Sequence, residues 1–192
     1  PFPRLTYKEV MEKYGNDKPD LRKNKDDPDE LAFVFVLDWP MFAKKHDGSL
    51  GATHHPFTLP KTDDIAEIKK NPLDIISYQH DLVLNGYEVG GGSIRIHRPE
   101  LLETIFEILG HTKEEIQNQF GHLLEAFKYG VPPHGGIAPG IDRFIMIIQN
   151  EPNIREVFAF PKTGDGRDLM MDAPSEINED QLKELGLSIK KK

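Results

Sequence analysis

A β-hairpin signal constrains the fold of this chain more than any other feature. Residues 76–97, ISYQHDLVLNGYEVGGGSIRIH, divide at Asn85-Gly86 into two arms rich in β-branched and apolar residues. Asn-Gly between two such arms is typical of a two-residue turn, because both of its central residues need a positive φ. We therefore expect an antiparallel strand pair over this segment.

Other segments predict further strands and a set of helices. Residues 32–39, AFVFVLDW, form a continuous apolar run that is typical of a strand buried on both faces, and residues 157–161, VFAFP, predict another short strand. Antiparallel strands with separate helices indicate an α+β fold. Capping boxes predict helices at 6–14, from 112 to a stop at Gly130, and from 178, and Pro99 predicts a helix from 99. A further helix is expected at about 141–149, after the glycine segment.

Composition narrows the class of protein. The chain has 192 residues, which is within the usual range for one domain, and its 38% hydrophobic and 29% charged residues are typical of a globular protein rather than a disordered or membrane protein. It has no cysteine, which excludes disulfides and thiolate metal sites and makes a cytoplasmic setting the simplest expectation. Its net charge of −8 argues against nucleic-acid binding over the whole protein surface, but it permits a local basic groove.

Two carboxylates flank the predicted turn. Asp81 and Glu88 lie on opposite arms, and a cation such as Mg²⁺ carrying nucleotide phosphates would relieve their repulsion if they met. The alternative is that both face solvent. In a regular strand, side chains alternate between the two faces of the sheet, so Glu88 would lie on the face opposite to Gly91, Ser93 and Arg95. A bulge near the glycines would change this assignment of faces. Three glycines in one strand suggest either a ligand lying against the backbone or a poorly packed, bulged strand.

Two further segments carry candidate ligand-binding residues. In GGIAPGIDR, residues 135–143, small residues permit close approach of a ligand, and Arg143 in the first helical turn could pair with a phosphate or with a local carboxylate. Both alternatives stay open. His54 and His55 are adjacent and point in different directions, which makes a zinc site a weak interpretation; they could bind an anionic substrate or lie on the surface.

At these motifs the chain resembles the class II aminoacyl-tRNA synthetases, and specifically the bacterial-type aspartyl-tRNA synthetases. GIAPGIDRFIM resembles motif 3 of the class, and the GGGSIRIH form distinguishes the bacterial aspartyl type from its relatives. The resemblance covers nearly the whole chain in family order. The stretches that carry it are DKPDLR (17–22), FVFVLDWPMF (33–42), HHPFTLPK (54–61), DLVLNGYEVGGGSIRIH (81–97), KYGVPPHGGIAPGIDR (128–143) and AFPKTGDGRDLMMDAPS (159–175).

The resemblance implies a two-step reaction that uses ATP and Mg²⁺. L-aspartate is activated to aspartyl-adenylate, and the aspartyl group then passes to the acceptor end of tRNA(Asp); the intact family is homodimeric and not membrane-bound. Glu88 and Arg143 are the implied catalytic residues. The implied ligand sites are Asp81 and Glu88 for the metal; Glu88, Gly136, Gly140, Ile141, Asp142 and Arg143 for ATP; and Arg95, His54, His55 and Ser93 for aspartate.

The chain also departs from the family pattern. It lacks motifs 1 and 2 and the anticodon-binding domain, and the charged linker at 16–31 stands where the bacterial enzymes have an inserted domain. We therefore expect residues 1–192 to be a single partial class II catalytic domain, with a mixed, mainly antiparallel sheet flanked by helices. The alternative function is a non-catalytic synthetase-like module that binds Mg·ATP or aspartate.

Overall fold

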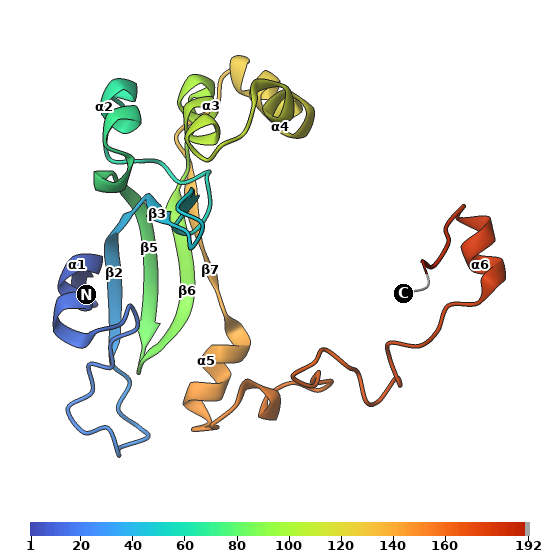
Figure 1. Cartoon of the computed structure of the whole chain (residues 1–192). Coiled ribbons are helices and arrows are strands. Elements are labelled where there is room, and N and C mark those ends of the chain that lie inside the picture. The colour runs from blue at the N-terminus through green and yellow to red at the C-terminus, as the bar shows by residue number, and fades with distance from the viewer. Residues whose placement is uncertain (191–192) are drawn as a thin grey trace. The chain divides into compact units, whose positions relative to one another are not determined.

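The computed structural model describes residues 1–190 and divides into two units, residues 1–144 and residues from 145 onward. The first unit contains a five-stranded sheet in the order β1-β2-β5-β6-β7 (Figure 1). β1 is parallel to β2, and every other neighbouring pair is antiparallel, which confirms the α+β prediction. The strands are β1 Arg4–Thr6, β2 Phe33–Pro40, β5 Ile76–Leu84, β6 Tyr87–Ile94 and β7 Gly135–Pro139.

The predicted hairpin is present and its turn has the expected backbone. β5 and β6 are joined by Asn85 and Gly86, whose φ angles are 51° and 85°. Both values lie in the left-handed region that the Asn-Gly pair tolerates best. A second, smaller hairpin of β3 Phe42–Lys44 and β4 Leu50–Ala52 was not predicted.

Thr6, Thr112 and Asn178 cap the starts of three helices, as predicted. Thr6 with Glu9, and Thr112 with Glu115, form complete capping boxes, and Gly15 ends the first helix in the left-handed conformation. The helix α2 was not predicted. The helices are α1 Tyr7–Tyr14, α2 Ile65–Lys70, α3 Pro99–Ile108, α4 Lys113–Lys128, α5 Ile141–Ile148 and α6 Glu179–Glu184, with 3₁₀ turns at Pro72–Asp74 and Ile154–Glu156.

Two apolar clusters hold the first unit together. One cluster lies between α1 and the sheet, where Val10 packs against Val34, Val36, Trp39 and Val83. The other surrounds α2, α3 and α4, which Figure 1 shows at one end of the strands. The second cluster is built on Met41, Phe42, Ile68, Ile75, Ile96, Leu101, Leu102, Ile105, Phe106, Ile116 and Leu124.

Two strand predictions need correction, and one strand was not predicted. β2 is not buried on both faces: its side chains alternate, with Val34 and Val36 fully buried and their neighbours half-buried, because α1 covers one face only. Residues 157–161 form no strand. Residues 135–139, expected to let a ligand approach closely, form the edge strand β7. Gly135 allows the backbone to approach β6 closely, since a Cβ there would lie 2.7 Å from the carbonyl oxygen of Ser93.

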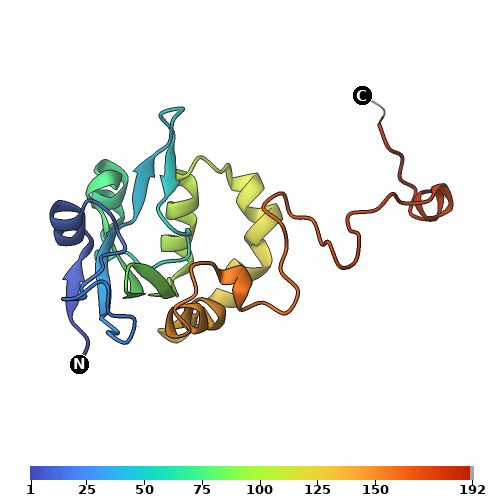
Figure 2. The ribbon, with the colours of Figure 1, turned by 90° about the horizontal axis from the view of Figure 1, so that it is seen from below.

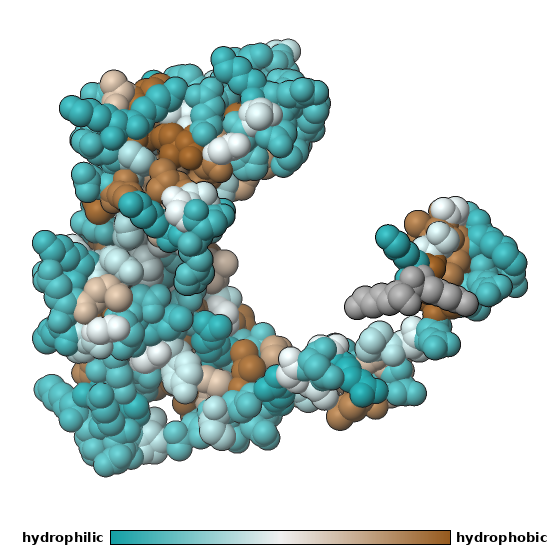
Figure 3. Space-filling model, in the orientation of Figure 1, coloured by the Kyte–Doolittle hydropathy of each residue, from teal (hydrophilic) through white to brown (hydrophobic). Residues whose placement is uncertain are grey.

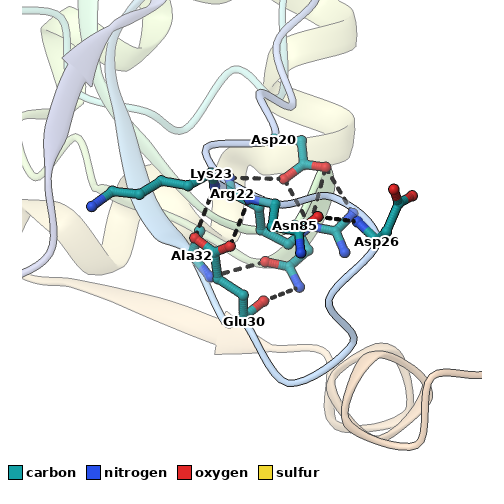
Figure 4. Close-up of polar contacts among 8 residues, drawn as sticks. Asp20, Arg22, Lys23, Asp26, Glu30, Ala32 and Asn85 are labelled. Carbon is teal, nitrogen blue, oxygen red and sulfur yellow. Dashed lines mark hydrogen bonds and ion pairs between the residues drawn. The ribbon is translucent and has the colours of Figure 1, made fainter.

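The charged segment 16–31 is an ordered loop (Figure 4). The guanidinium of Arg22 donates to the carboxylate of Asp20 at 2.8 Å, which holds the pKa of Asp20 below its usual value. The carboxylate of Glu30 accepts hydrogen bonds from the backbone N–H groups of Lys23 and Asn24. These contacts close the loop on itself with its own charged side chains.

The hairpin turn anchors the same loop. The Asn85 side-chain oxygen accepts from the backbone N–H of Ala32 at 2.9 Å, and its amide donates to the carbonyl oxygen of Glu30 at 2.9 Å. Figure 4 shows Asn85 between these two partners. One residue therefore supplies the positive φ of the turn and fixes the start of β2.

The second unit has little buried surface of its own. Within residues 145–190, only Met146 and Ile147 are buried, and the chain after α5 is mostly irregular (Figure 2). Apolar side chains are exposed around α6, including Leu185 at 69% and Ile189 at 69% (Figure 3). Across the described residues, no helix is long and apolar enough to cross a membrane.

Candidate functional site

A β-bulge brings the two hairpin carboxylates onto one face of the sheet. Leu82 pairs with Gly90 and the next residue, Val83, pairs with Glu88, so Val89 is the extra residue in β6. This extra residue places Glu88 on the same face of the sheet as Asp81 and Gly91, instead of on the opposite face, which regular alternation predicts. A Cβ on Gly91 would lie 3.0 Å from Oε1 of Glu88 and 3.3 Å from Oδ1 of Asp81. The carboxylates thus converge over a glycine that leaves them room.

Asp81 is a buried acid. It is only 3% exposed, and the side-chain amide of Gln79 donates to its Oδ1 at 2.8 Å, while Nε2 of His54 lies 4.0 Å from its Oδ2. Burial raises the pKa of Asp81, the Gln79 hydrogen bond opposes that effect, and the charge of Glu88 adds to it. The alternative that both carboxylates face solvent is therefore wrong for Asp81.

Arg143 reaches this carboxylate pair because α5 starts at the bulge. The backbone N–H of Gly140 donates to the carbonyl oxygen of Val89 at 2.8 Å, which fixes the beginning of the helix. From the first turn, Nη1 of Arg143 donates to the carbonyl oxygen of Glu88 and lies 3.9 Å from its Oε2. The Arg143 side chain is 43% exposed, so part of its guanidinium is accessible to a ligand.

The other end of the hairpin holds a guanidinium and an imidazole. Nη1 of Arg95 donates to Nε2 of His55 at 2.5 Å. Burial and the neighbouring Arg95 lower the pKa of His55 to about 4, so the ring is neutral at pH 7 and can accept this bond. His54 points elsewhere: its ring meets Trp39 edge to face at 4.5 Å. The predicted divergence of the two histidines is confirmed.

The glycines of β6 and β7 have different structural roles. A Cβ on Gly92 would overlap the carbonyl oxygen of Gly136 and lie 2.8 Å from Cα of Ile137, so Gly92 serves close strand packing. A Cβ on Gly136 would meet nothing within 4 Å. Of the two alternatives for the glycines of β6, the bulged strand is present; Gly92 serves the packing of β6 on β7, and Gly91 leaves room for the carboxylates.

The structure brings most of the predicted residues to one face, in two groups. Asp81, Glu88 and Arg143 form one group and Arg95 and His55 the other; His54 lies nearest to Asp81. Ser93 lies between the groups, is fully buried and has an Oγ without a hydrogen-bond partner. The remaining predicted ATP residues are all exposed: Gly136 lies on β7, Gly140 joins β7 to α5, and Ile141 and Asp142 begin α5.

Gln79 belongs to this site and was not predicted from the sequence. It is directly opposite Ser93 in the β5-β6 register, and its contact with Asp81 is described above. Its Oε1 is buried without a partner. The signal that could have found it is the period of two, which places Gln79 on the face of Asp81 in any regular strand.

The carboxylate pair suits a cation that brings its own ligands. Within residues 1–190, no group of three or more His, Cys, Asp and Glu side chains is placed to hold a metal ion. Mg²⁺, however, is usually bound by one or two carboxylates together with water and substrate phosphates. The space over Gly91, which a Cβ would fill, and the two oxygens that border it fit such an ion.

Solved structures share this fold. The aspartyl-tRNA synthetase of Entamoeba histolytica matches with a TM-score of 0.61 and 25% identity, covering 88% of this chain and 33% of that one. The asparaginyl-tRNA synthetase of the same organism, in complex with asparaginyl-adenylate, matches with a TM-score of 0.60 and 20% identity, covering 88% of this chain and 37% of that one. The architecture is therefore that of a class II aminoacyl-tRNA synthetase domain.

The chain belongs to the family described as tRNA synthetases class II (D, K and N), whose model matches residues 1–164. It is 52% identical over 164 residues to the aspartate–tRNA(Asp/Asn) ligase of Rubrobacter xylanophilus and 52% identical over 165 residues to the aspartate–tRNA ligase of Staphylococcus aureus. Each match covers 85% of this chain but only 27% and 28% of the two relatives. The resemblance to bacterial aspartyl enzymes is confirmed.

Proposed function

We propose that this chain is part of an aspartate–tRNA ligase and contributes the site that binds Mg·ATP and L-aspartate. The observation that carries the proposal is the arrangement along one hairpin: a carboxylate pair with Arg143 at one end, and Arg95 with His55 at the other. The 52% identity to two ligases that are named for aspartate supports the same substrate.

Arg95 is the proposed partner of the aspartate side chain. A guanidinium pairs bidentately with a carboxylate, whereas the amide of asparagine matches it poorly. His55 accepts from Nη1 of Arg95 and is neutral at pH 7, so it orients the guanidinium without competing as a second cation. Ser93 and His54 border the path between Arg95 and Asp81 and complete this proposed amino acid site.

The ATP phosphates are proposed to lie at the carboxylate end. Asp81 and Glu88 would hold Mg²⁺, which supplies positive charge that neutralises the phosphates. Arg143, anchored to the backbone of Glu88, presents the exposed part of its guanidinium to the γ-phosphate. The adenosine would lie against the exposed residues Gly136, Gly140, Ile141 and Asp142.

The reaction needs positioning and charge stabilisation rather than a protein nucleophile. An α-carboxylate oxygen of aspartate forms a bond to the α-phosphorus of ATP, and the bond to the pyrophosphate oxygen breaks, giving aspartyl-adenylate and pyrophosphate. Arg95 fixes the amino acid and Arg143 fixes the triphosphate, which brings the reacting atoms together. The aspartyl group then passes to the terminal adenosine of tRNA(Asp), and AMP leaves.

The proposed partners follow from this reaction. The acceptor end of tRNA(Asp) must reach the same sheet face, and a second copy of the parent polypeptide is the expected homodimer partner. We place the reaction in the cytoplasm, where tRNA is charged for protein synthesis. Because the chain spans 27–28% of the two ligases, we expect full activity to need the parts of those proteins that it does not match.

Aspartate-dependent exchange of pyrophosphate into ATP tests the proposal, with asparagine as the control amino acid. We expect exchange with aspartate alone in a polypeptide of the relatives' full length that carries this chain. Arg95→Ala should abolish it, whereas Arg98→Ala should not, because Arg98 pairs with Asp63 and Glu100 on the surface. Absence of aspartate-dependent exchange, or activity that survives Arg95→Ala, would contradict the proposal.

A further inference from the structure

We infer that Gln79 is a positioning residue for the cation site, holding Asp81 in the orientation that converges with Glu88. The inference deepens the proposed function and rests on it, because it concerns the same carboxylate pair. Gln79 does not touch the reacting atoms; it acts through Asp81.

The first support is the geometry of the amide. Nε2 of Gln79 lies 2.8 Å from Oδ1 of Asp81, and only the amide NH₂ group can donate to a carboxylate. The contact therefore fixes which way the amide points. It also fixes Oδ1 on the Gly91 side, where Glu88 Oε1 converges with it.

The second support is burial. Gln79 is 5% exposed and Asp81 is 3% exposed, so neither side chain can replace this hydrogen bond freely with bulk water. A carboxylate held in a single orientation binds a metal ion better than a mobile one, because less conformational freedom is lost on binding. The hydrogen bond thus prepares Asp81 as a ligand before the cation arrives.

The third support is the unused end of the same amide. Oε1 of Gln79 is buried and has no hydrogen-bond partner, although buried acceptors are almost always satisfied. Mg²⁺ keeps several of its waters when it binds protein carboxylates, and these waters are strong donors. A cation-bound water next to Asp81 would satisfy this oxygen, so one amide can orient the ligand and receive the water that the ion carries.

The test measures Mn²⁺ binding to the full 192-residue chain by the loss of the free-Mn²⁺ electron paramagnetic resonance signal. Gln79→Met keeps the length of the side chain and removes both the NH₂ donor and the Oε1 acceptor of the amide. Gln79→Ala is the second variant, for use if the first does not fold. We expect the dissociation constant for Mn²⁺ to rise about 10–100-fold, the usual effect of losing an outer partner of a metal ligand.

Two further variants make the result specific. Thr104→Val removes a different buried polar group, a hydroxyl that donates to the carbonyl oxygen of Glu100 within α3, and should leave Mn²⁺ binding unchanged. Asp81→Asn removes the ligand itself and should weaken binding at least as much as Gln79→Met. Circular dichroism of each variant establishes that the fold is retained.

Three results would overturn the inference, and they are distinguishable. If Asp81→Asn weakens binding but Gln79→Met does not, the cation site stands and the role of Gln79 is wrong. If Thr104→Val weakens binding as much as Gln79→Met, the effect is not specific to Gln79. If the wild-type chain binds no Mn²⁺, or binds it equally with Asp81→Asn, the proposed cation site fails and the inference fails with it.

Discussion

Glu88 shares a sheet face with Asp81 because Val89 is one residue more than the opposite strand provides. Without that bulge, the carboxylate of Glu88 would lie on the other face of the sheet. The carbonyl oxygen of Val89 also accepts a hydrogen bond from the backbone N–H of Gly140. This bond fixes the start of α5, the helix that carries Arg143. A single irregularity in β6 therefore assembles the carboxylate pair and its arginine.

Gly91→Ala should weaken cation binding without unfolding the sheet. The added methyl group would lie 3.0 Å from Glu88 Oε1 and 3.3 Å from Asp81 Oδ1, so the carboxylates must move apart. We expect Mn²⁺ affinity to fall about tenfold or more, which electron paramagnetic resonance titration would measure. Gly164→Ala is the matched control, because its Cβ meets nothing within 4 Å and it lies outside the residues proposed to bind ATP, aspartate or the cation. Equal affinity in the two variants would contradict the convergence of the carboxylates.

Asp81→Asn should stabilise the folded chain at pH 7 while it removes the cation site. The pKa of Asp81 is raised above 3.8 chiefly by burial, so the folded state holds this proton to higher pH than the unfolded state does. Above the raised pKa, the buried charge lowers the free energy of unfolding, and the amide lacks this penalty. Urea unfolding should show the gain at pH 7 and lose it at pH 3. A destabilised variant at pH 7 would mean that the contacts of Asp81 outweigh its burial.

Stability should fall as the pH drops from about 6.5 towards 4, with His55 as one cause. The pKa of His55 is lowered from 6.5 to about 4, first by burial and then by Arg95 and His54. Between these values, the unfolded chain binds the proton and the folded chain does not, so acid favours unfolding. His55→Phe should flatten this part of the profile in urea unfolding at pH 7, 5.5 and 4.5. An unchanged slope would show that His55 does not titrate as described.

Asn85→Ala should cost about 2–5 kcal/mol of stability, the sum of two lost hydrogen bonds and the backbone strain. The substitution removes the hydrogen bonds to Ala32 and Glu30, each worth about 0.5–1.5 kcal/mol, and places alanine at a φ of 51°, which costs about 1–2 kcal/mol. Asn85→Gly separates the two effects, because glycine tolerates the φ but makes neither bond. Thermal or urea unfolding measures both variants. Equal losses would show that backbone strain contributes nothing.

Local signals predicted the elements that depend on local chemistry. Thr6 and Thr112 begin helices because their hydroxyls accept the free N–H groups of the first turn, and Asn85-Gly86 forms the turn because both residues tolerate a positive φ. Gly135–Pro139 was missed as a strand because its pairing with β6 is a contact between distant segments, and a glycine-rich sequence carries no strand propensity.

For the site, the sequence by itself determined the inventory of charged groups: two carboxylates beside one turn, an arginine after the glycines, and another at the start of a helix. Only the tertiary structure decided which of them meet. The bulge at Val89 set the face of Glu88, burial of Gln79 directed its amide to Asp81, and the β6-β7 contact placed Arg143 at Glu88. The physical reason is that a bulge within a hairpin, the burial of a side chain and the pairing of β6 with the distant β7 all depend on contacts across the sheet, which local propensity does not encode.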